Sequence, residues 1–177
     1  MVGDRTTIRE YATLNRGTRT AGKTVVGSDC LLMAYVHVAH DCVIGDRVII
    51  SNSVQMGGHV EIGEWAAVGG LTAIHQFVRI GAHAFVGGAA RVHKDVAPYV
   101  RAAGNPLVMS GLNSIGLRRR GFDAETRRAL KQLYRLVFAS ELNVTQAVAR
   151  ARDELGGRPE VDRFLTFIED SERGLAL

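Results

Sequence analysis

The sequence of 177 residues is long enough for one large domain, or for a medium-sized domain with a smaller appendage. With 46% hydrophobic and 23% charged residues, its composition is that of an ordinary globular protein and excludes a disordered chain. The net charge is +4, and residues 111–135 carry seven basic and two acidic side chains, which is typical of a surface for an anionic partner or simply of a solvated helix face.

A six-residue repeat dominates residues 2–92. Fifteen of the sixteen positions in this series are aliphatic or methionine: Val2, Ile8, Leu14, Thr20, Val26, Leu32, Val38, Ile44, Ile50, Met56, Ile62, Val68, Ile74, Ile80, Val86 and Val92, with Thr20 the exception. A period of six fits neither a helix nor a plain strand. It predicts a hexapeptide β-solenoid of about five coils, with three hexapeptides to each triangular coil. The aliphatic side chain should point inward, and the small residue that follows it should let the backbone turn.

Two features of this pattern need explanation. Residues 16–25 are rich in charge and glycine and place Thr20 on an inward position, so they predict a protruding loop. Val2 is already on the repeat, which leaves the first coil without a polar cap. We therefore expect that upstream coils are missing from this chain, with coverage by another chain as the alternative.

The character of the sequence changes after the repeats. Residues 95–111 contain Pro98 and Pro106 and are expected to be irregular. Helical periodicity then predicts three helices, which run from an N-cap at Asp123 to about residue 140, from 145 to 155, and onward from Pro159.

The predicted fold is therefore mainly β. Residues 1–97 form a parallel β-helix, and residues 98–177 form an irregular segment with a three-helix domain.

Two cysteines, Cys30 and Cys42, are too few for a disulfide framework and fall on small inward positions, which predicts buried inert thiols. No run of 18 apolar residues occurs, so membrane insertion is not expected and the sequence indicates a cytoplasmic protein. No zinc finger and no aromatic interleaving accompany the basic patch, so nucleic acid is not an expected partner.

Several polar residues meet on one wall when positions are compared in steps of 18. His40 lies below Gly58, which lies below Gln76, and Asp41 lies below His59. Imidazole suits general-base work, and an adjacent carboxylate can orient it. A glycine one coil away offers a backbone N–H for an oxyanion.

Two other interpretations compete with a catalytic one. Histidines on solenoid walls are often hydrogen-bonded polar residues at contacts between subunits. A zinc site is the second interpretation, in which His37, His40, His59 and His75 converge in a groove between subunits, as in the prism-shaped carbonic anhydrases. That family's pair of histidines separated by four residues does not occur here, so a bound metal is not expected.

Several motifs together resemble one family. These are HVAHDC (37–42), GGHV (57–60), GGLTAIHQF (69–77), IGAHAFVGG (80–88), PYV (98–100), GN (104–105), GLN (111–113) and GLRRRGF (116–122). They resemble the UDP-N-acetylglucosamine O-acyltransferases, which catalyse the first step of lipid A synthesis. The resemblance implies a left-handed parallel β-helix, a homotrimer and active sites between neighbouring prisms. It also implies transfer of a (3R)-3-hydroxyacyl group from acyl carrier protein to the 3-hydroxyl of UDP-N-acetylglucosamine, without a cofactor.

The resemblance also assigns roles to individual residues. His40 would be the general base, Asp41 its partner and Gly58 the oxyanion donor. The substrate-binding residues would be His37, His59, His75 and Gln76 around the donor and sugar nucleotide, Asn113, Arg119 and Arg120 at the nucleotide and phosphates, and Gly88 at the position that limits acyl length. The basic segment that opens the helical region also suits an acidic acyl carrier protein.

The chain departs from the family in lacking several N-terminal coils and an upstream segment that helps to hold the sugar nucleotide. A truncated, non-catalytic trimeric scaffold therefore remains an alternative. A related N-acyltransferase of the same pathway is another, although residues 104–105 and 118–122 fit the O-acyltransferases better.

Overall fold

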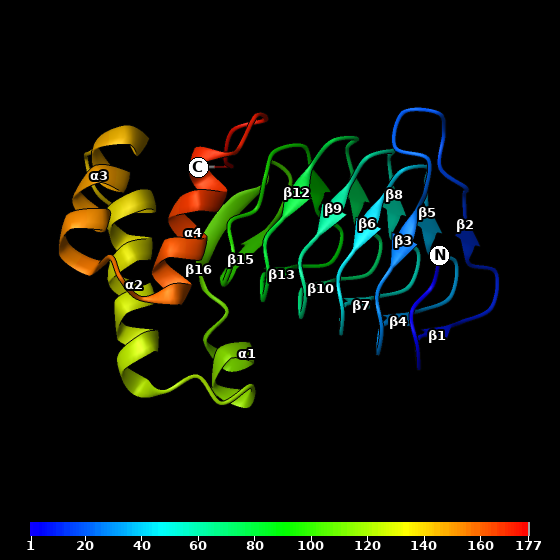
Figure 1. Cartoon of the computed structure of the whole chain (residues 1–177), viewed down its shortest axis with the longest axis horizontal. Helices are drawn as coiled ribbons and strands as arrows, with labels where there is room; N and C mark the ends of the chain where they lie inside the picture. Colours follow the sequence, from blue (N-terminus) through cyan, green and yellow to red (C-terminus); the bar gives the residue numbers. More distant parts are fainter. Residues whose placement is uncertain (177) are drawn as a thin grey trace.

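A computed structural model describes residues 1–176, which form a β-solenoid followed by a helical region at its C-terminal end (Figure 1). The solenoid strands are β1 (Thr7–Ile8), β2 (Thr13–Leu14), β3 (Val25–Val26), β4 (Leu31–Leu32), β5 (His37–Val38), β6 (Val43–Ile44), β7 (Ile49–Ile50), β8 (Gln55–Met56), β9 (Glu61–Ile62), β10 (Ala67–Val68), β11 (Ala73–Ile74), β12 (Arg79–Ile80), β13 (Phe85–Val86) and β14 (Arg91–Val92). They stack into three parallel sheets, ordered β1-β4-β7-β10-β13, β2-β5-β8-β11-β14 and β3-β6-β9-β12. Strands β1–β12 make four complete coils, and β13 and β14 begin a fifth.

The predicted register and inward column are confirmed. Residue i pairs with residue i + 18 in the next coil, as Ile44 does with Ile62. From Val26 to Val92, every residue of the six-step series is at most 3% exposed. Burial of each such aliphatic side chain stabilises the fold by about 1.5–3 kcal/mol, so this column is the core of the prism.

The small residues of the repeat have a different role from the one expected. The left-handed conformation at each turn belongs to a non-glycine residue two positions later, such as Arg47 (φ 57°) after Gly45. The Arg47 N–H donates to the Ser28 carbonyl of the coil below, at 2.8 Å. A Cβ atom at Gly45 would lie 2.7 Å from the backbone nitrogen of Glu64. Glycine is therefore needed for the close approach of successive coils, not for the turn.

The connection between β2 and β3 is longer than the other connections of the solenoid. Thr13 pairs with His37, 24 positions later, which is six more than the coil period. The extra residues lie between β2 and β3 and extend from the solenoid wall (Figure 1, blue).

The expectation of an irregular segment over residues 95–111 is wrong. Strands β15 (Val100–Ala103) and β16 (Val108–Leu112) form an antiparallel hairpin, and β15 pairs with β13 in parallel. Pro98 precedes β15 and Pro106 lies in the turn, so neither proline occupies a strand position that needs an N–H donor. The hairpin extends the solenoid sheet toward the helices.

The three predicted helices are α2 (Ala124–Phe138), α3 (Val144–Leu155) and α4 (Pro159–Glu169). Asp123 caps α2 as expected, because its carboxylate accepts from the Thr126 N–H at 2.8 Å. An additional short helix, α1 (Ser114–Arg119), precedes them, so the three-helix expectation is one helix short. Its signal is weak in the sequence because the helix is short and contains Gly116.

Cys30 and Cys42 are free and buried, and burial raises the pKa of both thiols. Among residues 1–176, no helix has the length and apolarity needed to cross a bilayer.

Candidate active site

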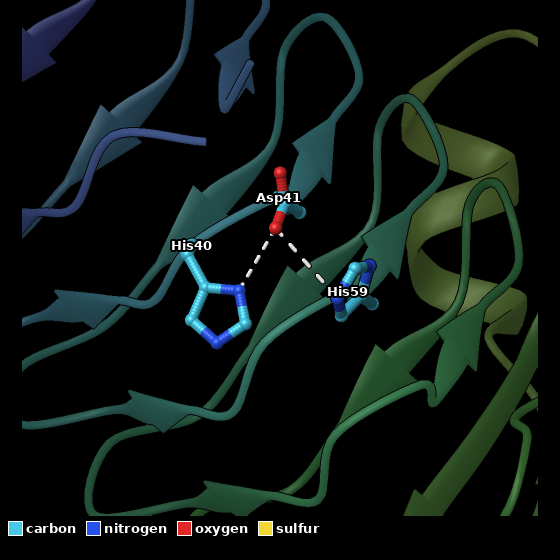
Figure 2. A group of neighbouring side chains, drawn as sticks. All are labelled: His40, Asp41 and His59. Carbon is cyan, nitrogen blue, oxygen red and sulfur yellow. Dashed lines mark hydrogen bonds and ion pairs between the residues drawn. The ribbon is translucent and has the colours of Figure 1, made fainter. Parts of the chain in front are cut away.

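The predicted catalytic residues lie on one corner of the prism, where the β5-β8-β11 sheet turns into the β6-β9-β12 sheet. We call this the histidine corner; it comprises residues 39–42, 57–60 and 75–78. Asp41 and His59 occupy its left-handed turn positions, with φ of 60° and 58°. Figure 2 shows the Asp41 carboxylate between two imidazoles. Its Oδ2 atom lies 2.9 Å from His40 Nδ1 and 3.6 Å from His59 Nε2.

Exposure differs sharply within this group. The Asp41 side chain is 0% exposed, whereas that of His40 is 43% exposed. The Asp41 carboxylate accepts a hydrogen bond from Nδ1 of His40. The other ring nitrogen, Nε2, makes no hydrogen bond within residues 1–176. Asp41 thus fixes the orientation of the His40 ring.

The protruding loop supplies the remaining contacts of Asp41. The Thr18 N–H donates to Asp41 Oδ1 at 2.8 Å, and the Thr18 hydroxyl donates to Oδ2 at 2.6 Å. The backbone N–H of Asp41 donates to the Thr24 hydroxyl at 2.9 Å. The Thr18 hydroxyl, together with His40 and the Thr18 N–H, lowers the pKa of Asp41 to about 2. The carboxylate therefore stays charged at neutral pH.

Gly58 lies directly against the His40 ring. A Cβ atom at position 58 would lie 2.5 Å from His40 Cε1 and 2.7 Å from Nε2. Only glycine leaves room for the imidazole in this orientation. Within the described residues the Gly58 N–H donates no hydrogen bond, so it remains available to a ligand.

The other predicted histidines are more loosely connected to this group. His37 is on β5, and its Nδ1 lies 2.7 Å from the Thr13 hydroxyl. His75 and Gln76 are on the histidine corner, one coil above Gly57 and Gly58, and His75 Nδ1 lies 3.1 Å from the Gln76 carbonyl oxygen. Neither His37 nor His75 contacts Asp41 in the described part of the chain, so the four histidines of the zinc hypothesis do not converge within one chain.

Within residues 1–176, His40, Asp41 and His59 alone offer three possible metal ligands within 4.8 Å of one another. Asp41 Oδ2 already accepts from Thr18 and His40, so a metal would have to displace these hydrogen bonds. The donor set fits a proton-transfer pair better than a zinc site.

The predicted nucleotide residues lie on a different corner. A cavity of about 750 Å³, which we call the arginine cavity, is lined by Arg119, Arg120 and aromatic side chains that include Trp65. The Arg120 guanidinium lies 5.2 Å from the centroid of the Trp65 ring, and its Nη1 atom is buried without a partner among the described residues. The cavity thus offers an aromatic face and two arginine side chains.

Asn113 and His83 form the buried wall of this cavity. The Asn113 amide donates to the His83 carbonyl at 2.9 Å, and its oxygen accepts from the Gly116 N–H at the start of α1. His83 stacks against Tyr99, and burial together with the Arg120 charge lowers its pKa to about 4. The repeat pattern gives no signal for His83, which fills a turn position that elsewhere holds Arg47 or Trp65.

Gly88 lies on the third corner, where the β7-β10-β13 sheet turns toward β14. A Cβ atom there would lie 3.1 Å from the Gly70 carbonyl oxygen. Apart from His37 on β5, the predicted site residues are therefore divided among all three corners of the prism.

Comparisons with known proteins agree with these features. Residues 23–58 match a bacterial transferase hexapeptide family model, and residues 95–176 match a model described as domain 2 of UDP-N-acetylglucosamine O-acyltransferase. Two curated relatives bear the name acyl-[acyl-carrier-protein]--UDP-N-acetylglucosamine O-acyltransferase. The one from Anaeromyxobacter sp. (strain K) is 47% identical over 99% of this chain and 68% of its own length. The one from Chlorobaculum parvum is 59% identical over 98% of this chain and 66% of its own length.

A solved structure of LpxA from Acinetobacter baumannii superposes with a TM-score of 0.96 and 40% identity, over 99% of this chain and 69% of that one. The resemblance on which the sequence analysis relied is thereby confirmed. With its hexapeptide solenoid, its helical second region and identities of this size, the chain belongs to the UDP-N-acetylglucosamine O-acyltransferase family.

Proposed function

We propose that this protein transfers a (3R)-3-hydroxyacyl group from acyl carrier protein to the 3-hydroxyl of UDP-N-acetylglucosamine. The observation that carries the proposal is the His40–Asp41 pair beside Gly58: Nδ1 of His40 is hydrogen-bonded to Asp41, Nε2 has no hydrogen-bond partner among residues 1–176, and the side chain is partly exposed. The donor and acceptor follow from the names of the relatives, which specify acyl carrier protein and UDP-N-acetylglucosamine.

The chemistry needs only groups on the histidine corner. The Nδ1–H group of His40 donates a hydrogen bond to the Asp41 carboxylate, so the proton stays on Nδ1 and the ring lone pair is on Nε2. Nε2 then takes the proton of the sugar hydroxyl as its oxygen attacks the thioester carbonyl carbon. The N–H of Gly58 stabilises the oxyanion. When the tetrahedral intermediate collapses, the carbon–sulfur bond breaks and His40 returns its proton to the departing thiolate.

We further propose that the working protein is a homotrimer. The histidine corner, the arginine cavity and Gly88 lie on three different corners of one prism, so one chain cannot bring them to a single substrate. Packing three prisms side by side would place the corners of neighbouring copies against each other. Large apolar side chains exposed on the prism support such packing, among them Ile49, Leu71, Phe77 and Phe85.

Within such a trimer, the remaining predicted residues take complementary roles. Arg119 and Arg120 of a neighbouring copy would bind the phosphates of the nucleotide, with Asn113 supporting the cavity wall. His37, His59, His75 and Gln76 would line the sugar and the acyl donor, and Gly88 would leave room for the acyl chain. The same proposal includes a left-handed sense of the solenoid and a division of the chain into a β-helix domain, residues 1–97, and a C-terminal region, residues 98–177.

The test is an assay of the purified protein with UDP-N-acetylglucosamine and a panel of 3-hydroxyacyl carrier protein thioesters of different lengths. We expect mass spectrometry to detect a singly acylated sugar nucleotide with at least one donor, and none with the matching acyl donors that lack the 3-hydroxyl. The 3-amino analogue of the acceptor tests the N-acyltransferase alternative. A trimer that forms no product with any donor would contradict the proposal and favour the scaffold.

A further inference from the structure

The loop between β2 and β3 has a defined path toward the histidine corner. Gly17 passes so close to the opposite side of the loop that a Cβ atom there would collide with the backbone of Lys23. The Gly22 N–H donates to the Thr18 carbonyl at 2.8 Å, and Gly22 has a φ of 78°, which closes the turn. The loop therefore holds Thr18 in one place.

The Thr18 hydroxyl faces the carboxylate of the catalytic pair. The hydroxyl oxygen accepts a hydrogen bond from the Thr20 N–H at 3.3 Å, and the hydroxyl donates a hydrogen bond to Asp41 Oδ2 at 2.6 Å. This is the same oxygen atom that lies 2.9 Å from His40 Nδ1. One carboxylate oxygen is thus shared between the loop and the proposed base.

We propose that Thr18 is a positioning residue of the catalytic pair: its hydroxyl fixes the Asp41 oxygen that selects the tautomer and orientation of His40. This inference rests on the proposed function, because it concerns how the proposed base is held. Two imidazoles compete for that oxygen, since His59 Nε2 lies only 3.6 Å away. Without the Thr18 hydroxyl, only the hydrogen bond from the Thr18 N–H to Oδ1 holds the carboxylate from the loop, so Oδ2 can turn toward His59 and His40 loses the acceptor that keeps its proton on Nδ1.

The loop does not depend on this hydroxyl for its own attachment. The Thr18 N–H still donates to Asp41 Oδ1, and the Asp41 N–H still donates to the Thr24 hydroxyl. The Gly22–Thr18 backbone hydrogen bond is also independent of the side chain. Replacement of Thr18 by valine, which has nearly the same shape, therefore removes the orienting contact and the long 3.3 Å hydrogen bond from the Thr20 N–H, and keeps the backbone hydrogen bonds that close the loop.

The test compares Thr18→Val with Thr18→Ser, which keeps the hydroxyl. The matched control is Thr20→Val, the same change at an exposed position of the same loop. We expect Thr18→Val to lower kcat by about 10-fold with the KM for UDP-N-acetylglucosamine unchanged. Thr18→Ser should restore most of the rate, and Thr20→Val should match the parent protein.

A second readout follows the tautomer directly. In the protein with 15N-labelled histidine, the His40 signals should indicate a proton held on Nδ1 in the parent and Thr18→Ser proteins, and a mixture of tautomers in Thr18→Val. Unchanged kcat and unchanged His40 signals in Thr18→Val would overturn the inference, as would a loss confined to KM or to thermal stability. A His40→Ala variant measured alongside separates the two proposals: if it is inactive while Thr18→Val is fully active, only the role of Thr18 fails.

Discussion

Replacement of His40 by alanine is expected to lower kcat/KM for acyl transfer by at least about 10²-fold. The variant removes the imidazole that Asp41 holds through a 2.9 Å hydrogen bond, so no group remains at that position to accept the hydroxyl proton. The fold should survive, because the His40 side chain is 43% exposed and belongs to no part of the solenoid core. Initial rates with a 3-hydroxyacyl carrier protein and UDP-N-acetylglucosamine measure the effect.

His93→Ala is the matched control. His93 follows β14 two coils above the Gly57–Gly58 turn, is exposed, and has its Nδ1 3.3 Å from the Arg91 carbonyl oxygen rather than near Asp41. Its replacement should leave the rate within about two-fold of the parent. If the His40 variant kept the parent rate, with the same circular dichroism and the same oligomeric state, His40 would not be the base.

Gly58→Ala should have a comparably large effect by a steric route. The new methyl group would lie 2.5 Å from His40 Cε1, well inside contact distance, so the imidazole must leave its place beside Asp41. The φ of Gly58 is not positive, so alanine strains the backbone little. We expect kcat to fall by about 10²-fold through loss of the base geometry and obstruction of the Gly58 N–H.

Gly70→Ala separates this effect from the general effect of a methyl group on the solenoid wall. Gly70 occupies the same place in its hexapeptide, two repeats later, and its Cβ atom would lie 3.0 Å from the Asn52 carbonyl oxygen instead of a histidine ring. Thermal unfolding of both variants should show similar small losses of stability, with the rate lost only in Gly58→Ala. Equal rates in the two variants would show that the contact with His40 is unimportant.

The six-residue repeat predicts the solenoid and also the contacts across coils. Because the aliphatic series sets the register at 18 residues, it places Gly58 against His40 and Asp41 near His59, as the structure shows. The repeat does not reveal why glycine is needed at its small positions. The repeat marks small positions, but only the coordinates show that Gly45 meets the next coil while Arg47 makes the turn.

Features without a repeat were harder to predict. Residues 16–25 could be recognised as a loop, but nothing in their sequence indicates that Thr18 folds back onto Asp41 over 23 positions. Strands β15 and β16 could not be predicted from the sequence, because Pro98 and Pro106 favour irregular structure and only the fold places both of them just outside the strands. Long-range contacts and short elements depend on the surrounding packing, which local patterns do not contain.

The most direct measurement is a crystal structure of the protein with bound UDP-N-acetylglucosamine. The 3-hydroxyl oxygen of the sugar should lie about 2.6–3.2 Å from Nε2 of His40, with the nucleotide phosphates on Arg119 and Arg120 of a neighbouring copy. A sugar that binds beyond the reach of that imidazole, or a His40 ring turned away into contacts within its own chain, would contradict the assignment of the base.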